Sequence, residues 1–142
     1  MNVLECRLKA YNPDNNCNYM VVELLVDGQL IADFGYYATD FKELFNSISE
    51  SGSYFILTCW CGQPECVGIH KGIEVKHEKN KVYWNITMPE PSRRYAFNQE
   101  QYTKAIESCI TQGKKTLKKK QQYDTNPTEI TPDRNKPFFS LE

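Results

Sequence analysis

The sequence lacks the features that place a protein in or across a membrane. No apolar run approaches the roughly eighteen residues that a membrane-spanning helix needs. The first six residues contain no basic segment followed by an apolar stretch, so they do not resemble a secretory signal peptide. We therefore expect a cytoplasmic protein that binds no membrane. In that compartment its six cysteines are interpreted as reduced thiols rather than as disulfide bridges.

Recognisable catalytic motifs are also missing. The chain contains no glycine-rich phosphate loop, no His-Glu-x-x-His pattern and no nucleophile elbow. His70 and His77 are its two histidines, so few side chains are available as a general base near neutral pH. The sequence favours a protein that is not an enzyme. A cysteine-dependent or metal-dependent enzyme is the weakest alternative, kept because a thiol beside an imidazole can be activated.

Length and composition indicate one globular domain followed by a tail. The 142 residues include 40% hydrophobic and 13% aromatic side chains, which is enough for a single hydrophobic core. Near the end of the sequence, Pro127, Pro132 and Pro137 oppose regular secondary structure. We predict a globular α+β domain over residues 1–122 and an extended, proline-containing tail over residues 123–142.

Apolar periodicity predicts an antiparallel sheet of five to seven short strands with two helices on one side. A two-residue Asp-Gly hairpin turn is expected at residues 27–28. Thr39 or Asp40 is expected to cap the first helix, and Asn98 with Gln101 resembles a capping box for the second. The first helix is expected to place Phe41, Leu44, Phe45 and Ile48 on one face. The strands are expected over residues 2–10, 19–26, 30–34, 54–58, 73–77, 81–86 and 93–97.

The densest chemistry lies in residues 59–70, which read Cys-Trp-Cys-Gly-Gln-Pro-Glu-Cys-Val-Gly-Ile-His. A turn that doubles the chain back would bring these thiols and the imidazole together as the ligands of a tetrahedral zinc site. The proposed ligands are Cys59, Cys61, Cys66 and His70. Two alternatives stay open: small buried thiols that pack in an ordinary tight turn, and a redox disulfide. The single residue between the first two cysteines is shorter than the usual spacing of zinc ligands.

Charge is unevenly distributed although the net charge is only −1. Residues 1–60 hold eight acidic and three basic side chains, a net charge of −5, whereas residues 61–142 have a net charge of +4. An acidic surface steers a basic partner protein toward it. The alternative is that these acids only solvate the outer faces of strands and a helix. The residues expected to form the acidic surface are Asp27, Asp33, Asp40, Glu43 and Glu50.

The lysine-rich segment over residues 114–120 is the main basic feature. Cations near the carboxyl end of a helix interact favourably with the helix dipole, and no aromatic residues alternate with these lysines. The segment is therefore interpreted as the charged end of the last helix, and nucleic-acid binding is not favoured.

Several of these residues also form an ordered pattern that spans about residues 54–106. The pattern comprises a strand, Thr58-Cys59-Trp60-Cys61-Gly62, Cys66-Val67-Gly68-Ile69, a hairpin with Val82-Tyr83-Trp84, and a segment from Arg94 to Tyr102. It resembles a group of small uncharacterised bacterial proteins with a Cys-x-Cys-Gly-x-x-x-Cys-x-Gly-Ile motif. Proteins of this kind include immunity proteins of contact-dependent growth inhibition. The resemblance implies a toxin inhibitor that binds and occludes a basic cognate toxin, such as a nuclease. The alternative is a small protein with a structural zinc site in the cysteine-rich loop and an unknown partner.

Overall fold

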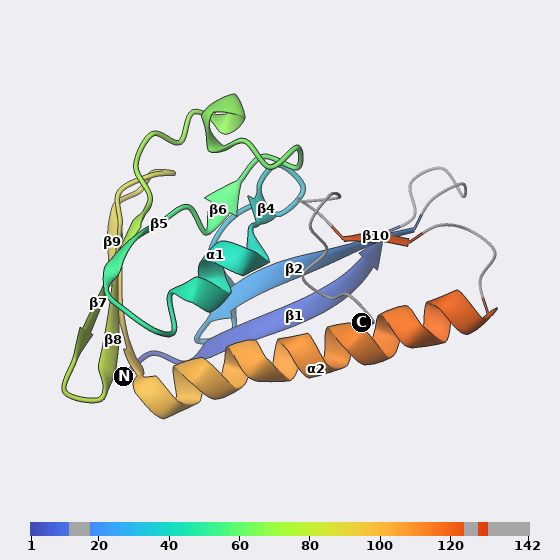
Figure 1. Cartoon of the computed structure of the whole chain (residues 1–142). Helices are drawn as coiled ribbons and strands as arrows, with labels where there is room; N and C mark the ends of the chain where they lie inside the picture. Colours follow the sequence, from blue (N-terminus) through green and yellow to red (C-terminus); the bar gives the residue numbers. More distant parts are fainter. Residues whose placement is uncertain (12–17, 124–127, 131–142) are drawn as a thin grey trace.

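The computed structural model describes residues 1–11, 18–123 and 128–130, and it has an α+β architecture (Figure 1). Two α-helices accompany antiparallel sheets of short strands, which confirms the predicted class. The strands are distributed over a four-stranded sheet, a two-stranded ribbon and a second four-stranded sheet. Both larger sheets and both helices contribute to one hydrophobic core.

The first sheet is built on a long antiparallel hairpin. It consists of β1 (Leu4–Tyr11), β2 (Asn18–Val26) and the short β3 (Gln29–Leu30), which returns along β2. In the turn between β2 and β3, Asp27 and Gly28 have φ angles of 54° and 80°. The predicted Asp-Gly turn is confirmed, because a two-residue hairpin turn of this type requires positive φ at both central residues.

A strand from the end of the chain joins this sheet. β10 (Thr128–Ile130) pairs in parallel with β2. These three residues belong to the segment predicted as an extended tail, residues 123–142, whose prolines were expected to oppose regular secondary structure. Residues 124–127 and 131–142, which make up most of that tail, lie outside the described part of the chain.

The strand predicted over residues 30–34 is wrong beyond Leu30. The chain turns instead, because the backbone carbonyl of Asp33 accepts hydrogen bonds from the N–H groups of Tyr36 and Tyr37 at 3.0 and 2.8 Å. The Asp33 carboxylate also accepts the N–H of Gly35 at 2.9 Å. Asp side chains commonly form such local turns, which compete with strand pairing.

A two-stranded antiparallel ribbon, β4 (Ala38–Thr39) with β6 (Leu57–Thr58), lies beside β2. The Thr39 hydroxyl donates a hydrogen bond to the carbonyl of Val22 on β2 at 2.7 Å, and both groups are buried. This bond fastens the ribbon to the first sheet, so the segment that follows β6 starts from a fixed position.

Helix α1 (Phe41–Asn46) lies between the two strands of the ribbon in sequence. The Asp40 carboxylate accepts the N–H of Glu43 at 3.2 Å, which confirms Asp40 as the predicted cap. Leu44 is fully buried, whereas Phe45, expected on the same apolar face, is 38% exposed. The helix ends after six residues, and its short length limits how many apolar side chains it can bury.

The second sheet is antiparallel, in the order β5 (Gly52–Tyr54), β7 (Ile73–Glu78), β8 (Lys81–Ile86) and β9 (Arg93–Asn98). The strands predicted over residues 73–77 and 81–86 are confirmed and pair as a hairpin, with Lys79 and Asn80 at φ angles of 49° and 66° in the turn. The strand predicted over residues 54–58 is divided, because the chain leaves the second sheet at the end of β5 and crosses to the ribbon.

Helix α2 (Gln99–Tyr123) runs alongside β1 (Figure 1). The Asn98 carboxamide accepts the N–H of Gln101 at 3.1 Å, which confirms the predicted cap. The Gln101 side chain does not complete a capping box. Its amide instead bonds both the N–H and the carbonyl of Leu4, at 3.0 and 2.7 Å, and so pairs with the edge of β1 as a neighbouring strand would.

A chain of hydrogen bonds crosses the centre of the core. Trp84 Nε1 donates to the Tyr102 hydroxyl at 3.1 Å, and that hydroxyl lies 2.5 Å from Ser47 Oγ. Ser47 Oγ donates to the carbonyl of Leu44, so the Tyr102 hydroxyl must donate to Ser47. His77 Nε2 lies 2.7 Å from the carbonyl of Ser47. These hydrogen bonds therefore connect β8, α2, the end of α1 and β7. They also give partners to polar groups whose burial without a hydrogen bond would cost free energy.

Candidate metal centre

The cysteine loop, residues 59–70, connects β6 of the ribbon to β7 of the second sheet. It contains one turn of 3-10 helix, η1 (Pro64–Val67), and it projects from the side of the fold away from α2 (Figure 1). At its two ends, Thr58 and Ile69 are 1% and 3% exposed. The loop is thus anchored in the core at both ends while its middle extends outward.

Glycine and proline shape the path of this loop. The Gly62 N–H donates to the carbonyl of Cys59 at 2.9 Å, in a tight turn that Gly62 permits with a φ angle of 91°. Pro64 begins η1, and Gly68 ends it with a φ angle of 76°. The N–H of Ile69 then bonds the carbonyl of Pro64 at 3.1 Å. These two turns fold the loop back on itself.

The folded loop brings three thiols together. The Sγ atoms of Cys59, Cys61 and Cys66 all lie within 4.8 Å of one another, and those of Cys61 and Cys66 are 3.4 Å apart. Cys59 is half-buried, whereas Cys61 and Cys66 are exposed. The alternative interpretation of Cys59 and Cys61 as two buried hydrophobic side chains is therefore wrong for Cys61. A solvent-accessible cluster of thiols can bind a metal ion.

Neighbouring groups favour ionisation of one thiol of this cluster. The backbone N–H of Gln63, followed by the thiols of Cys66 and Cys59, lowers the pKa of Cys61 below its ordinary value. The pKa of Cys66 is raised to about 11, chiefly because this thiol hydrogen-bonds Cys61 and lies beside its charge. Cys61 is consequently the first of the pair to become a thiolate, the form that binds metals.

The sulfur separations suit zinc. Zn–S bonds of about 2.3 Å in a tetrahedral site place sulfur ligands roughly 3.8 Å apart. The 3.4 Å separation of Cys61 and Cys66 lies just below that value, and the 4.8 Å limit for the whole cluster lies above it. Side-chain movements of about 1 Å or less would bring the three sulfur atoms to the separations of a zinc site.

His70, the fourth residue predicted as a ligand, is not in the group of atoms within 4.8 Å of one another. It is exposed, and its backbone N–H donates to the sulfur of Met88 at 3.3 Å. Ligation by the His70 imidazole stays a prediction. The contact with Met88 holds the carboxyl end of the loop, and no local sequence pattern indicates it because Met88 lies 18 residues away.

The remaining described cysteines lie elsewhere. Cys109 of α2 is 1% exposed, and burial raises its pKa to about 12. Burial, followed by the neighbouring Cys109 thiol, also raises the pKa of Cys6 on β1. Both thiols therefore stay protonated near neutral pH and are poor nucleophiles. Cys17 lies outside the described residues.

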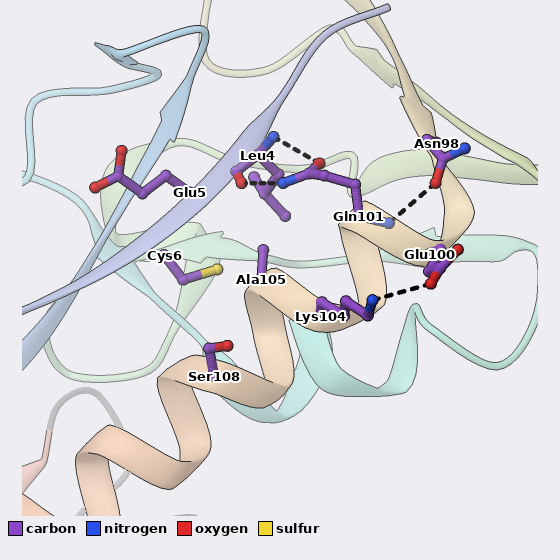
Figure 2. Close-up of a pocket in the computed structure, with 9 residues that line it drawn as sticks. All are labelled: Leu4, Glu5, Cys6, Asn98, Glu100, Gln101, Lys104, Ala105 and Ser108. Carbon is purple, nitrogen blue, oxygen red and sulfur yellow. Dashed lines mark hydrogen bonds and ion pairs between the residues drawn. The ribbon is translucent and has the colours of Figure 1, made fainter.

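A groove of about 550 Å³ lies between β1 and α2 (Figure 2). Several of its polar side chains are already engaged: Gln101 with the backbone of Leu4, and Lys104 with Glu100 at 2.9 Å. The Cys6 thiol points toward α2 in this groove, but its raised pKa disfavours the reactive thiolate. The groove thus offers no activated nucleophile among its lining residues.

Most of the acids predicted to bind a basic partner have structural roles. The Asp27 carboxylate accepts the side-chain amide of Asn2 at 2.7 Å and the N–H of Val3 at 2.8 Å, and these bonds lower its pKa. The Asp33 carboxylate accepts the N–H of Gly35. Both acids therefore stabilise turns of the first half of the chain.

The other three acids lie in or near α1. Asp40 caps the helix, and Glu43 Oε1 accepts the N–H of Phe55 at 3.0 Å. Glu50 is exposed, and its backbone carbonyl accepts the Tyr54 hydroxyl at 2.8 Å. Binding of a basic partner by these five acids stays a prediction. Glu50→Lys is the best probe of it, since reversal at the other four would also remove a hydrogen bond of the fold.

Asp40→Ala is expected to lower the free energy of unfolding by about 1 kcal/mol, because the N–H of Glu43 loses its acceptor. Glu50→Ala removes the same charge without removing a cap, so its effect should stay within about 0.5 kcal/mol. Urea denaturation of both variants measures the difference. Equal effects would mean that charge, not capping, is what Asp40 contributes to stability.

Comparisons with protein-family models, curated proteins and solved structures return no match to this chain. Within the residues that the structure describes, no helix combines the length and apolar character needed to span a membrane. The cysteine cluster is therefore the feature from which a function can be argued.

Proposed function

We propose that the cysteine loop binds one zinc ion as a structural site. The thiolates of Cys59, Cys61 and Cys66 supply three ligands, and the imidazole of His70 supplies the fourth. The observation that supports the proposal is the convergence of three sulfur atoms within 4.8 Å on one short loop. Thiolate sulfur favours zinc over magnesium or calcium, which prefer oxygen ligands.

His70 is proposed as the fourth ligand because it lies in the same loop as the three cysteines. Three cysteines and one histidine form a common tetrahedral zinc set. The His70 side chain is exposed, so packing in the core does not fix the orientation of its ring. The hydrogen bond from its backbone N–H to the sulfur of Met88 holds its main chain.

A bound ion would stabilise a loop that has little hydrophobic support of its own. Between Thr58 and Ile69, none of the loop residues is buried. The loop nevertheless joins the ribbon to the second sheet, and its shape rests on a few backbone hydrogen bonds. Zinc would cross-link the end of β6 to η1, and the free energy of binding would add to the stability of the folded protein.

Protein purified under reducing, metal-replete conditions is expected to contain about one zinc per chain. Cys66→Ala removes a ligand and should reduce the zinc content sharply, whereas Cys6→Ala, which removes a thiol on β1, should leave it unchanged. Elemental analysis of the three proteins measures the content. A zinc-free wild-type protein, or full loading of Cys66→Ala, would overturn the proposal.

Chelation and a histidine variant complete the test. EDTA should lower the thermal unfolding midpoint of the wild type, with no effect on Cys66→Ala. His70→Ala should still bind zinc through three thiolates but should release it to a competing chelator more readily. Unchanged competition in His70→Ala would show that the fourth ligand is not this histidine.

A further inference from the structure

Cys61 and Cys66 are placed for a second reaction besides metal binding. Their sulfur atoms are 3.4 Å apart, closer than the roughly 3.8 Å of two ligands in a tetrahedral zinc site. A disulfide requires an S–S distance of about 2.05 Å, so the two atoms need to approach by only about 1.4 Å. Rotation of two exposed side chains can supply much of that approach.

The position of these thiols on the loop favours this pair over others. Both are exposed, so a small oxidant can reach them without any opening of the core. Four residues separate them in sequence, and η1 already brings Cys66 back beside Cys61. Cys59 is half-buried, and a disulfide between Cys59 and Cys61 would close a strained ring with a single intervening residue.

We propose that Cys61 and Cys66 form a reversible disulfide on reaction with a small-molecule disulfide such as oxidised glutathione, and that this oxidation expels the bound metal. The disulfide depends only on the two thiols. Metal expulsion rests on the zinc site proposed above.

The reaction balances as two thiol–disulfide exchanges. The sulfur of Cys61, as a thiolate, attacks one sulfur of oxidised glutathione, forming a mixed disulfide and releasing one glutathione thiolate. The sulfur of Cys66 then attacks the Cys61 sulfur, which breaks the mixed disulfide and releases the second glutathione. The protein thiols are oxidised, one molecule of the small disulfide is reduced to two thiols, and the protons of the protein thiols pass to the released glutathione.

Oxidation and metal binding use the same atoms. Once Cys61 and Cys66 are joined, neither sulfur is a thiolate, and Cys59 is left as the last of the three thiolate ligands. One thiolate with a histidine falls well short of the four ligands of a structural zinc site. The loop would therefore hold either the metal or the disulfide.

Peptide mapping of metal-free protein tests the pairing. Cleavage after glutamate separates residues 51–65, with Cys59 and Cys61, from residues 66–74, with Cys66. After treatment with oxidised glutathione and alkylation, the two peptides should stay linked in the wild type and in Cys59→Ser. The linked peptides should separate on reduction, with a gain of two hydrogen atoms in mass. Linkage lost in Cys59→Ser would identify a Cys59–Cys66 bond and overturn the proposal, as would persistent glutathionylation or unreacted thiols.

The same oxidant applied to zinc-loaded protein tests the metal. Zinc release, followed with a colorimetric chelator, should rise in step with the linked peptide to about one ion per disulfide. Linked peptides without zinc release would overturn the proposal that oxidation expels the metal, but would still support the disulfide between Cys61 and Cys66. A protein that never contains zinc yet forms the linked peptide would refute the proposed metal site alone, so the two failures are distinguishable.

Discussion

Replacing Tyr102 with alanine is expected to lower the free energy of unfolding by about 3–5 kcal/mol. The Tyr102 side chain is fully buried, and its ring centroid lies 5.9 Å from that of Trp84 and 5.4 Å from that of Phe97. Loss of the ring leaves a cavity among these aromatic side chains. It also removes the hydroxyl that connects Trp84 Nε1 to Ser47. Urea denaturation measures the loss.

Tyr102→Phe separates the two contributions. This variant keeps the ring but leaves the buried Trp84 N–H without its acceptor, which should cost about 1–3 kcal/mol. Tyr36, which is 55% exposed, provides the matched control, and Tyr36→Ala should cost under about 1 kcal/mol. If Tyr102→Ala were no more destabilising than Tyr36→Ala, the aromatic cluster would not be the centre of the core.

Several local features of this fold, although not the turn at Asp33, could be predicted from the sequence because their causes lie within a few residues. The turn at Asp27 and Gly28 depends on the positive φ that these residue types tolerate. The caps at Asp40 and Asn98 depend on short side chains that reach an N–H three residues ahead. Each signal is complete in the local sequence, so the structure agrees with it.

Interactions between distant residues could not be predicted in the same way. Ser47 and Tyr102 are 55 residues apart in sequence, and Leu4 and Gln101 are 97 residues apart. Gln101 is typical of a capping box, but the edge of β1 offers its amide two bonds instead of one. The division of the expected strand over residues 54–58 likewise follows from the position of the ribbon, which depends on tertiary packing.

The candidate site was predictable to the extent that it is local. Its three thiols fall within eight residues, and the glycine–proline turn between them indicates that the chain reverses. The sequence does not indicate which sulfur atoms lie closest, because the separation of Cys61 and Cys66 depends on the path of the chain through η1. Composition also fails to distinguish an acid that solvates the surface from one that bonds the backbone, as Asp33 and Glu43 do.

Gly72→Ala is expected to lower the free energy of unfolding by about 2–3 kcal/mol, the second large effect. Gly72 is buried where the cysteine loop rejoins the second sheet. A Cβ atom at this position would lie 2.7 Å from the Ser53 hydroxyl oxygen and 2.9 Å from the backbone carbon and oxygen of Tyr54. The serine side chain can rotate away, but the Tyr54 backbone is held by pairing with β7. The substitution must therefore displace β5 or the start of β7.

Gly52→Ala provides the matched control, because Gly52 lies on β5 in the same sheet. A Cβ atom there would meet the Tyr54 ring at 3.4 Å, an ordinary contact, so its effect should stay within about 1 kcal/mol of the wild type. Thermal and urea denaturation of both variants give the comparison. Because the clash arises at the end of the cysteine loop, Gly72→Ala should also weaken zinc retention against a chelator, whereas Gly52→Ala should not. Equal stability of the two variants would show that the backbone of Tyr54 yields, and that the path of the chain between the loop and β7 is less constrained than its packing indicates.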